Sequence, residues 1–437
     1  MKSVAFHNLG CKVNSYEMEV MQQNLVKKGY FVVPFDSKAD IYVINTCTVT
    51  NMADRKSRQM IHRAKKLNPE ATVVAVGCYV QTDNEDILRD LSVDLAIGNN
   101  RKSQLVEILE EYLDKKERSC HIINIGEEKI YESMQMEKTS EHQRAFIKVQ
   151  DGCNQFCSYC IIPYARGRIR SRELEDTLKE VRGLADKGYK EVVLNGIHLS
   201  SYGMTGGTDF RESKLLSLVQ AVNEIPGIER IRLGSLEPRI ITQDFVEGLR
   251  KCDKICPHFH LSLQSGCDGV LQRMNRKYTS AEYRDGVKLL RKYFDRPAIT
   301  TDVIVGFPGE TEEEFHVTKD FLKEISFYEM HIFKYSMRKG TVAAAMEGQI
   351  PEPIKTTRSN ELIMLGDEMS KAFREDRIGE ETEVLFEEIK KIGNREYMIG
   401  HTREYIMVAS DNTDIIPGTV QKVSLQRMLT SEIVLCG

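Results

Sequence analysis

Short apolar segments that resemble β-strands alternate with helix-like segments along most of this 437-residue chain. The first part has strand-like runs at 3–9, 40–45 and 71–77, with helical patterns at 15–28 and 52–67 between them. The middle part has further runs at 145–150, 191–195, 229–234, 258–263, 298–305 and 328–333. This alternation predicts parallel sheets covered by helices. We therefore expect an α/β protein with an open parallel sheet in residues 1–125 and an incomplete (β/α)6 barrel in residues 140–375.

The last part of the chain has a different period. A helical pattern at 351–377 is followed by short alternating runs at 383–389, 397–401, 405–409, 419–425 and 432–435. Such runs, separated by turn residues, are typical of small antiparallel β-barrels. We expect a barrel of this kind in residues 376–437, with an acid-rich start. The polar stretch 117–143 is interpreted as a linker between the first two parts.

Three cysteines, Cys153, Cys157 and Cys160, follow the strand-like run 145–150 with the spacing C-x3-C-x2-C. A 4Fe-4S cluster is normally held by four Cys thiolates, so three thiolates leave one iron open to a small molecule. The alternative is a zinc site, but structural zinc usually takes four ligands from paired knuckles, and no second knuckle follows. The spacing resembles that of the radical S-adenosylmethionine (SAM) enzymes, in which the open iron binds SAM.

A second set of cysteines follows the three strands of the first part. Cys11, Cys47 and Cys78 each come after one strand-like run. Because the carboxyl ends of parallel strands meet at one edge of a sheet, these thiols are expected to converge there on a second cluster. The alternative is that they are three buried structural cysteines. The remaining cysteines are interpreted as bystanders, although Cys252 and Cys256 form a weak candidate for a metal clip.

Polar residues and glycines also follow the strands of the predicted barrel. Active residues of such barrels lie at the carboxyl ends of the strands, and glycines there let the backbone approach a ligand. We expect these residues to surround one cavity with the cysteine loop and to bind SAM, with Tyr159 packing near its adenine rather than in the core. The candidates are Tyr159, Asn195, Gly196, Ser235, Glu237, Gln264 and Gly306.

Two basic segments lie beside the cysteine sites. Arg55, Lys56 and Arg58 belong to the helix that follows Cys47, and a second series of alternating arginines follows Cys160. A charge run is usually a solvated face, but a basic segment beside a site also suits a phosphate backbone. We predict RNA contacts from both segments; the residues of the second are Arg166, Arg168 and Arg170.

The composition limits the class of protein. The net charge of −4 does not by itself indicate nucleic acid, and 41% hydrophobic with 29% charged residues is typical of a soluble globular chain. No apolar stretch is long enough to span a membrane, and no signal peptide is evident. Eleven cysteines in a reducing compartment favour metal binding over disulfides. We expect a cytoplasmic protein that binds neither membrane nor DNA.

Over its whole length the chain resembles the methylthiotransferases, radical SAM enzymes with an N-terminal cluster domain, a radical SAM barrel and a C-terminal TRAM barrel. Their six cysteines correspond to the two triplets described above. The segments Leu9-Gly10-Cys11-Lys12-Val13-Asn14, Asn45-Thr46-Cys47-Thr48-Val49-Thr50 and Ser265-Gly266-Cys267-Asp268 look most like the branch that acts on threonylcarbamoyladenosine at position 37 of tRNA. The segment 333–342 departs from the family in lacking expected prolines.

The resemblance implies two 4Fe-4S clusters, SAM, an electron donor such as flavodoxin or ferredoxin, and the tRNA anticodon loop as partner. One SAM methylates a sulfur at the first cluster. A second SAM is cleaved at the loop cluster, and the resulting radical activates C2–H of the adenine. Alternative substrates within the family are isopentenyladenosine in tRNA and an aspartate of a ribosomal protein. A different class of function would be a non-catalytic iron–sulfur protein that binds RNA.

Overall fold

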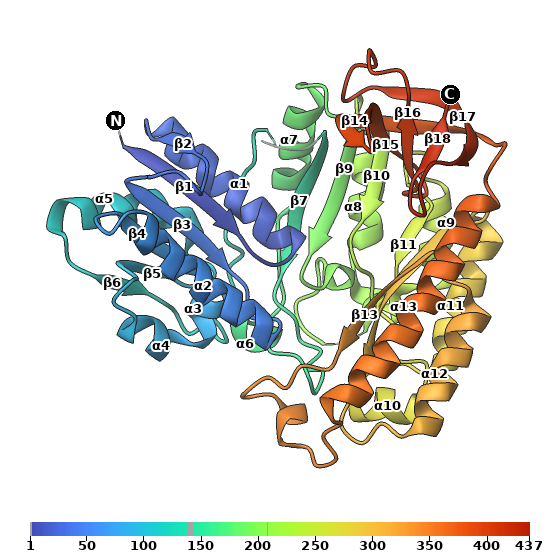
Figure 1. The fold of residues 1–437 in the computed structure, drawn as a ribbon, viewed down its shortest axis with the longest axis horizontal. Helices are drawn as coiled ribbons and strands as arrows, with labels where there is room; N and C mark the ends of the chain where they lie inside the picture. Colours follow the sequence, from blue (N-terminus) through green and yellow to red (C-terminus); the bar gives the residue numbers. More distant parts are fainter. Residues whose placement is uncertain (1, 139–142, 208) are drawn as a thin grey trace.

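The computed structural model describes residues 2–138, 143–207 and 209–437. The described chain forms three parts: an N-terminal parallel sheet with helices, a central partial barrel with helices outside it, and a small C-terminal barrel (Figure 1). This confirms the expected α/β fold class. The expected domain limits remain predictions, and the residue at which the second was expected to begin, 140, lies outside the described residues.

The N-terminal sheet has the strand order β2-β1-β3-β4-β5-β6, and its neighbouring strands all run parallel. Its strands are β1 (Ser3–Asn8), β2 (Phe31–Val33), β3 (Ile41–Thr46), β4 (Thr72–Gly77), β5 (Leu95–Ile97) and β6 (Ser119–His121). Its helices are α1 (Lys12–Lys27), α2 (Asn51–Leu67), α3 (Cys78–Thr82), α4 (Asn84–Arg89) and α5 (Leu105–Lys115). Strands β3 and β4 are fully buried, as expected for a sheet covered on both faces.

The central barrel consists of two groups of parallel strands. The first group is β7 (Arg144–Asp151), β9 (Glu191–Gly196) and β10 (Arg230–Leu233), and the second is β11 (His258–His260), β12 (Ala298–Val305) and β13 (Glu329–Lys334). Isolated parallel bridges from Ile231 to Ile255 and from Leu236 to Leu261 join β10 to the chain around β11. The short strand β8 (Arg170–Ser171) pairs antiparallel with β7. The six parallel strands therefore form an open barrel, as the strand–helix alternation predicted.

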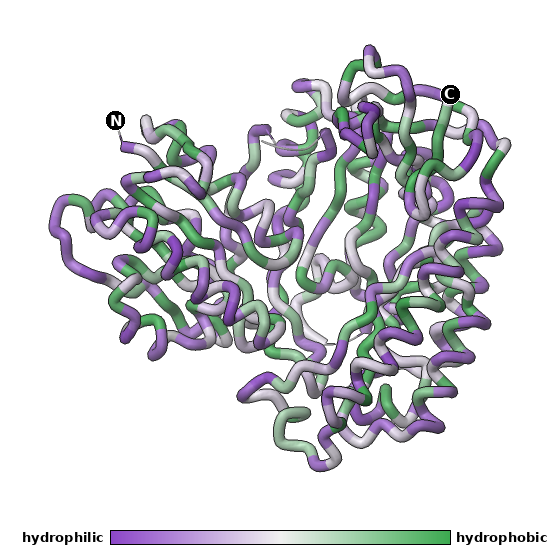
Figure 2. The backbone as a smooth tube through the Cα atoms, in the orientation of Figure 1, coloured by the Kyte–Doolittle hydropathy of each residue, from purple (hydrophilic) through white to green (hydrophobic). Residues whose placement is uncertain are grey.

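Helices cover the outside of this barrel. They are α7 (Leu174–Ala185), α8 (Leu215–Asn223), α9 (Gln243–Arg250), α10 (Asp268–Arg273), α11 (Ser280–Tyr293), α12 (Glu312–Ile325) and α13 (Glu352–Glu375), whereas the short helix α6 (Ile162–Arg166) packs on α3 of the N-terminal part. Thr279 and Thr311 begin α11 and α12 with capping boxes, which satisfy backbone donors at the helix ends. Hydrophobic and hydrophilic residues alternate along α11, α12 and α13, as expected for helices with one buried face (Figure 2).

The C-terminal part is a closed barrel with the strand order β14-β15-β16-β18-β17. Its strands are β14 (Glu381–Ile392), β15 (Arg395–Thr402), β16 (Met407–Ser410), β17 (Val420–Met428) and β18 (Val434–Cys436). All neighbouring pairs are antiparallel except β16 and β18, which run parallel. A closed ring with five strands cannot alternate in direction at every step, so one parallel pair is required. Within the described residues, no helix is long and apolar enough to cross a membrane.

Candidate active site

The loop after β7 carries the first cysteine triplet, Cys153, Cys157 and Cys160. Gly152 has φ +72°, and a Cβ there would lie 1.8 Å from the backbone oxygen of Arg168, so only glycine lets the loop turn at this point. The close approach allows the backbone N–H of Cys153 to donate to the carbonyl of Gly167 over 3.0 Å. The loop is thus held against the segment that follows α6.

These thiols are half-buried (Cys153 and Cys160) or buried (Cys157), and a cation lies beside them. Burial raises the pKa of the Cys153 thiol to about 12 and also raises the pKa of Cys160. The Arg276 guanidinium donates to the sulfur of Cys157 over 3.2 Å. Protonated thiols must lose their protons when metal binds, and a cation beside the sulfur favours the thiolate. Arg276 therefore suits a negatively charged metal cluster at this loop.

The second triplet lies at the carboxyl edge of the N-terminal sheet. Cys11 comes just before α1, Cys47 just after β3, and Cys78 at the start of α3 directly after β4. Gly77 has φ +100°, and a Cβ there would lie 2.7 Å from Oδ1 of Asn45, so this turn from strand to helix requires glycine. The turn directs Cys78 to the same edge as the other two cysteines.

The three sheet cysteines are neighbours that differ in exposure: Cys11 is exposed, while Cys47 and Cys78 are buried. Burial and the adjacent thiols of Cys78 and Cys11 raise the pKa of Cys47 to about 11. The Arg166 side chain donates through Nε to the sulfur of Cys78 over 3.4 Å. Each triplet is therefore accompanied by one arginine that donates to a sulfur: the half-buried Arg276 at the loop and the buried Arg166 at the sheet.

The spacing of the thiols bears on which metal they suit. Two thiolates on one zinc ion, each about 2.3 Å from it, lie about 3.8 Å apart. Among the described residues, one group of three has its ligand atoms all within 4.8 Å of one another, and it is His260, Asp302 and His331. In neither cysteine triplet, therefore, do all three sulfurs lie this close together. A 4Fe-4S cluster binds each thiolate through a different iron. Both triplets therefore fit a multi-iron cluster better than a single zinc ion.

A buried network of ion pairs joins the two sites. Glu17 on α1 accepts from Lys148 over 2.6 Å and from Arg166 over 2.7 Å, and it also pairs with Lys102. Asp151 pairs with Lys148 over 2.6 Å and with Arg166 over 3.2 Å. Burial alone would raise the pKa of Glu17, but the three cations around it lower it well below its usual value. The network thus fixes α1 of the N-terminal part against the barrel.

This network corrects part of the predicted RNA surface. Arg166 has none of its surface exposed and Arg170 only 2%, so neither side chain contacts solvent in this structure. Arg170 donates to the carbonyl of Arg166 and lies 3.7 Å from Asp151. The expectation of RNA contacts from these two arginines is wrong, because carboxylates from distant parts of the chain bury them. Arg168, between them, is exposed and stacks its guanidinium 4.4 Å from the ring centre of Phe156.

The basic residues of α2 remain exposed. Arg55, Lys56 and Arg58 all lie on its solvent side, and Arg58 donates to the hydroxyl of Tyr79 in α3 over 3.1 Å. The start of α2 is fixed to the barrel, where Arg338 donates to Thr48 over 2.7 Å and pairs with Asp54. Helix α3 packs on α6, which ends two residues before Arg168. The basic face of α2 is therefore connected to Arg168 through α3 and α6.

The predicted SAM residues lie at the carboxyl ends of the barrel strands, around the cysteine loop. Asn195 and Gly196 end β9, and a Cβ on Gly196 would lie 2.7 Å from Oε1 of Gln150. Glu237 pairs with Arg239 over 2.8 Å, and Arg239 donates to Gln155 in the cysteine loop. Among the other candidates, Ser235 is exposed, and Gln264 and Gly306 have positive φ. Tyr159 packs against the apolar group around Phe307. Their contacts with SAM remain predictions.

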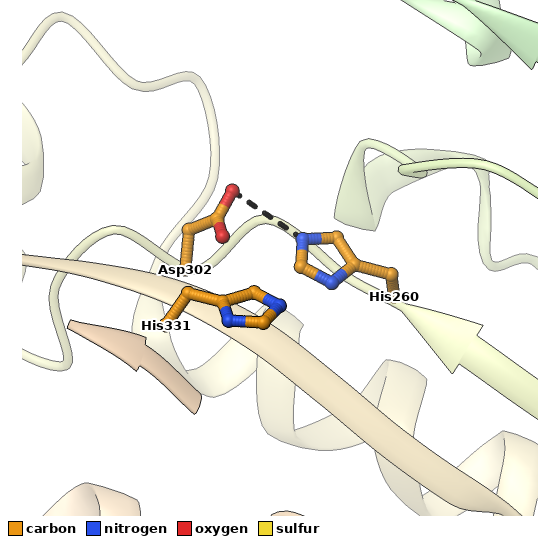
Figure 3. A group of neighbouring side chains, drawn as sticks. All are labelled: His260, Asp302 and His331. Carbon is orange, nitrogen blue, oxygen red and sulfur yellow. Dashed lines mark ion pairs between the residues drawn. The ribbon is translucent and has the colours of Figure 1, made fainter. Parts of the chain in front are cut away.

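Several polar residues on and around the barrel were not singled out by the sequence. His260, Asp302 and His331 come from β11, β12 and β13 and point toward one another (Figure 3). Nε2 of His260 lies 3.4 Å from Oδ2 of Asp302, and the two imidazole rings stack with centres 5.9 Å apart. Arg276 was also missed. No local motif marks such residues, since the strand pairing alone brings them together.

Comparison with known proteins places these features in a family. Residues 3–98 match the uncharacterized protein family UPF0004, and residues 147–322 match the radical SAM superfamily. A solved radical SAM methyltransferase, TsrM from Kitasatospora setae, shares the fold with a TM-score of 0.56 at 13% identity, covering 76% of this chain and 73% of that one.

Curated relatives match nearly the whole chain. Threonylcarbamoyladenosine tRNA methylthiotransferase MtaB of Bacillus subtilis is 42% identical over 97% of this chain and 94% of its own. The Aquifex aeolicus protein of the same name is 43% identical over 90% and 95%. A tRNA-2-methylthio-N(6)-dimethylallyladenosine synthase of Acetivibrio thermocellus is 36% identical over 92% and 84%. The chain belongs to the radical SAM methylthiotransferases, the family that its two cysteine triplets indicated.

Proposed function

We propose that this protein methylthiolates C2 of N6-threonylcarbamoyladenosine at position 37 of tRNA. The observation that carries the proposal is the second cysteine triplet, Cys11, Cys47 and Cys78, fixed beside the radical SAM loop by Glu17 and Arg166. Many radical SAM reactions need only the loop. A second open cluster site next to it suits transfer of a sulfur-containing group. Two relatives more than 40% identical over at least 90% of this chain carry this activity in their names.

The reaction replaces the hydrogen on C2 with a methylthio group. The methyl group comes from one SAM, the sulfur from sulfide held at the site of Cys11, Cys47 and Cys78, and the hydrogen leaves on the 5′-deoxyadenosine released from a second SAM. The electrons come from a donor such as flavodoxin or ferredoxin. Bound at the two triplets, 4Fe-4S clusters supply the electron for cleavage of SAM and the site for the transferred sulfur.

The chain's own residues hold and isolate the reacting groups. The cysteine loop and the strand ends around Asn195, Glu237 and Gln264 bind SAM, and the barrel wall excludes water from the radical. Arg276 and Arg166 each donate to one sulfur and so offset the negative charge of the bound thiolates. Asn99 donates to the carbonyl of Ala165 over 2.7 Å and to the sulfur of Cys78 over 3.5 Å. These contacts fix the position of α6 relative to the second triplet.

The RNA approaches from the exposed side of the two triplets. Arg55, Lys56, Arg58 and Arg168 offer cations to phosphates there. Tyr164 is half exposed and meets Phe156 edge-on, with ring centres 5.9 Å apart. Aromatic rings beside cations are what unstacked loop bases contact in RNA-binding proteins. The tRNA substrate implies that the enzyme acts in the cytoplasm.

The test uses the purified protein, reconstituted anaerobically with iron and sulfide and supplied with SAM and a reductant. Three tRNAs identical in sequence are compared, with threonylcarbamoyladenosine, isopentenyladenosine or unmodified adenosine at position 37. Mass spectrometry of the digested nucleosides should find the methylthio group on the threonylcarbamoyl nucleoside. Product on the isopentenyl nucleoside alone would assign the protein to the second group of relatives, and SAM turnover without any product would contradict both.

A further inference from the structure

Lys12 brings a cation to the inner face of the barrel. It begins α1, one residue after Cys11, and its Nζ lies 5.7 Å from the ring centre of Phe146 on β7. The neighbours of Phe146 in the strand, Ala145 and Ile147, pack into the main core behind the sheet. Since side chains alternate along a strand, Phe146 faces the opposite side, the interior of the barrel. Lys12 therefore lies inside the barrel and next to the sheet triplet.

The neighbouring arginines already have carboxylate partners. Arg144 lies 3.2 Å from Glu387, and Arg232 lies 3.0 Å from Glu191. Lys12 differs: within the described parts of the chain, no carboxylate oxygen lies within 4.0 Å of its ammonium group. Lys12 is exposed to the interior of the open barrel, and its charged neighbours there are Arg144, Arg232 and, beyond contact distance, Glu191, which already pairs with Arg232. An exposed ammonium that contacts no carboxylate of its own chain can pair with a carboxylate of a ligand.

The adjacent histidine cannot take this role. His258 lies on β11 near Lys12, and burial together with Arg232, His260 and Lys12 lowers its pKa well below the usual value. It is therefore neutral at pH 7, where it cannot supply a positive charge. Lys12 is left as the cation available to an anionic ligand on this part of the inner face.

We propose that Lys12 binds the carboxylate of the threonylcarbamoyl group and so selects this nucleoside. The inference rests on the proposed function. The threonylcarbamoyl substituent on N6 ends in a carboxylate, whereas an isopentenyl substituent is apolar and uncharged. C2 and the carbon that carries N6 flank the same ring nitrogen of adenine, N1. In a base with its C2 beside Cys11, the N6 substituent therefore starts close to the sheet triplet, within reach of Lys12, which follows Cys11 in the chain.

The test measures binding selectivity with the reconstituted holoenzyme. Anticodon stem-loops with threonylcarbamoyladenosine or with unmodified adenosine at position 37 are titrated into the wild type and into Lys12→Gln, Lys12→Arg and Lys27→Gln. Lys27 lies in the last turn of the same helix and pairs with Glu137 on the surface, so it is the matched control. Iron content is measured for each variant, because Lys12 adjoins a cluster ligand.

A charge-assisted hydrogen bond to a carboxylate accounts for about a tenfold to hundredfold difference in affinity. The affinity of Lys12→Gln for the modified stem-loop should fall by a factor of this size, and its affinity for the unmodified stem-loop should stay unchanged. Lys12→Arg should retain part of the selectivity, and Lys27→Gln all of it.

Two results would overturn the inference. One is a Lys12→Gln protein with unchanged selectivity, and the other is an equal loss of affinity for both stem-loops, which would place Lys12 in general RNA binding or in folding. Neither result touches the proposed function. That function fails instead if the wild-type enzyme makes no methylthio-threonylcarbamoyladenosine, whatever the variants bind.

Discussion

The two cysteine triplets differ in how the chain brings their sulfurs together. The loop triplet spans only residues 153–160 and depends on one turn at Gly152. The sheet triplet takes its cysteines from the ends of separate segments between Cys11 and Cys78, and it exists only when β1, β3 and β4 are paired. The loop is therefore a local structure, whereas the sheet triplet is a product of tertiary folding.

The arginines beside the triplets differ in the same way. Arg276 reaches Cys157 from within the barrel, and it also donates to the carbonyl of Ser262 and to the hydroxyl of Tyr278. Arg166 reaches Cys78 across the boundary between two parts of the molecule. A change that loosens the packing of the N-terminal part should therefore impair the sheet triplet and spare the loop. The first two predictions below separate the two sites, and the next two test the contacts around them.

The largest effect is expected from removal of the loop triplet. Replacing Cys153, Cys157 and Cys160 by Ala should abolish SAM cleavage, because the sheet triplet lies at the edge of the N-terminal sheet and not among the barrel strand ends that we propose bind SAM. Anaerobic reconstitution should then give about four irons per chain instead of about eight, since each cluster holds four. Iron analysis and chromatography of deoxyadenosine measure both outcomes. Full iron content in this variant would show that the loop holds no cluster.

Removal of the sheet triplet should abolish the product and leave SAM cleavage intact. With Cys11, Cys47 and Cys78 replaced by Ala, the loop keeps its own ligands and Arg276, so deoxyadenosine should still form. Methylthiolated nucleoside should disappear. Parallel assays of deoxyadenosine and nucleosides on the same samples separate the two steps. Methylthiolated product from this variant would remove the sheet triplet from sulfur transfer.

Arg166 and Arg168 form a matched pair for testing the buried network. Arg166→Met leaves Glu17 and Asp151 buried with fewer cations, and breaking a buried ion pair costs about 3–5 kcal/mol of stability. Arg168→Met changes an exposed side chain and should alter stability by about 0.5 kcal/mol or less. Denaturant unfolding measures the two differences. Equal effects of both changes would contradict the structural role given to Arg166.

A smaller effect is expected on RNA binding. Charge reversal of Arg55, Lys56 and Arg58 together should weaken binding to all tRNAs alike, because phosphate contacts position the RNA and carry no sequence information. The slope of log K against log salt should decrease by roughly 0.7 for each phosphate of single-stranded RNA that the variant no longer neutralises. Titrations at several salt concentrations measure this slope. An unchanged slope would exclude the exposed face of α2 from the RNA surface.

The sequence predicted the parts of the site that have a local signal. The loop cysteines have a fixed spacing, and Cys11, Cys47 and Cys78 could be placed because each follows a recognisable strand. The fold class followed from the same alternation. Strands β2, β5 and β6 are three residues long, which is too short for a period to be evident. Helix α13 has nearly the bounds expected for it.

The error at Arg166 and Arg170 shows that a sequence pattern cannot distinguish exposed arginines from buried ones. Alternating arginines look the same on a solvated surface and in a buried network. The partner of Arg166, Glu17, is 149 residues away in the chain, so no local pattern could indicate that pair. The same limit applies to Lys12, whose surroundings come from β7, β10 and the C-terminal barrel. Long-range pairing of charges decides which basic residues are free to bind RNA.

The central claim is that the sheet triplet places a methylthio group on threonylcarbamoyladenosine, and nucleoside mass spectrometry of cellular tRNA tests it most directly. Cells that lack this gene are compared with the same cells that carry the wild-type gene or the variant without Cys11, Cys47 and Cys78. We predict that methylthio-threonylcarbamoyladenosine is absent from the deletion strain, returns with the wild type and does not return with the variant. Unchanged levels in the deletion strain, with methylthio-isopentenyladenosine lost instead, would contradict the account.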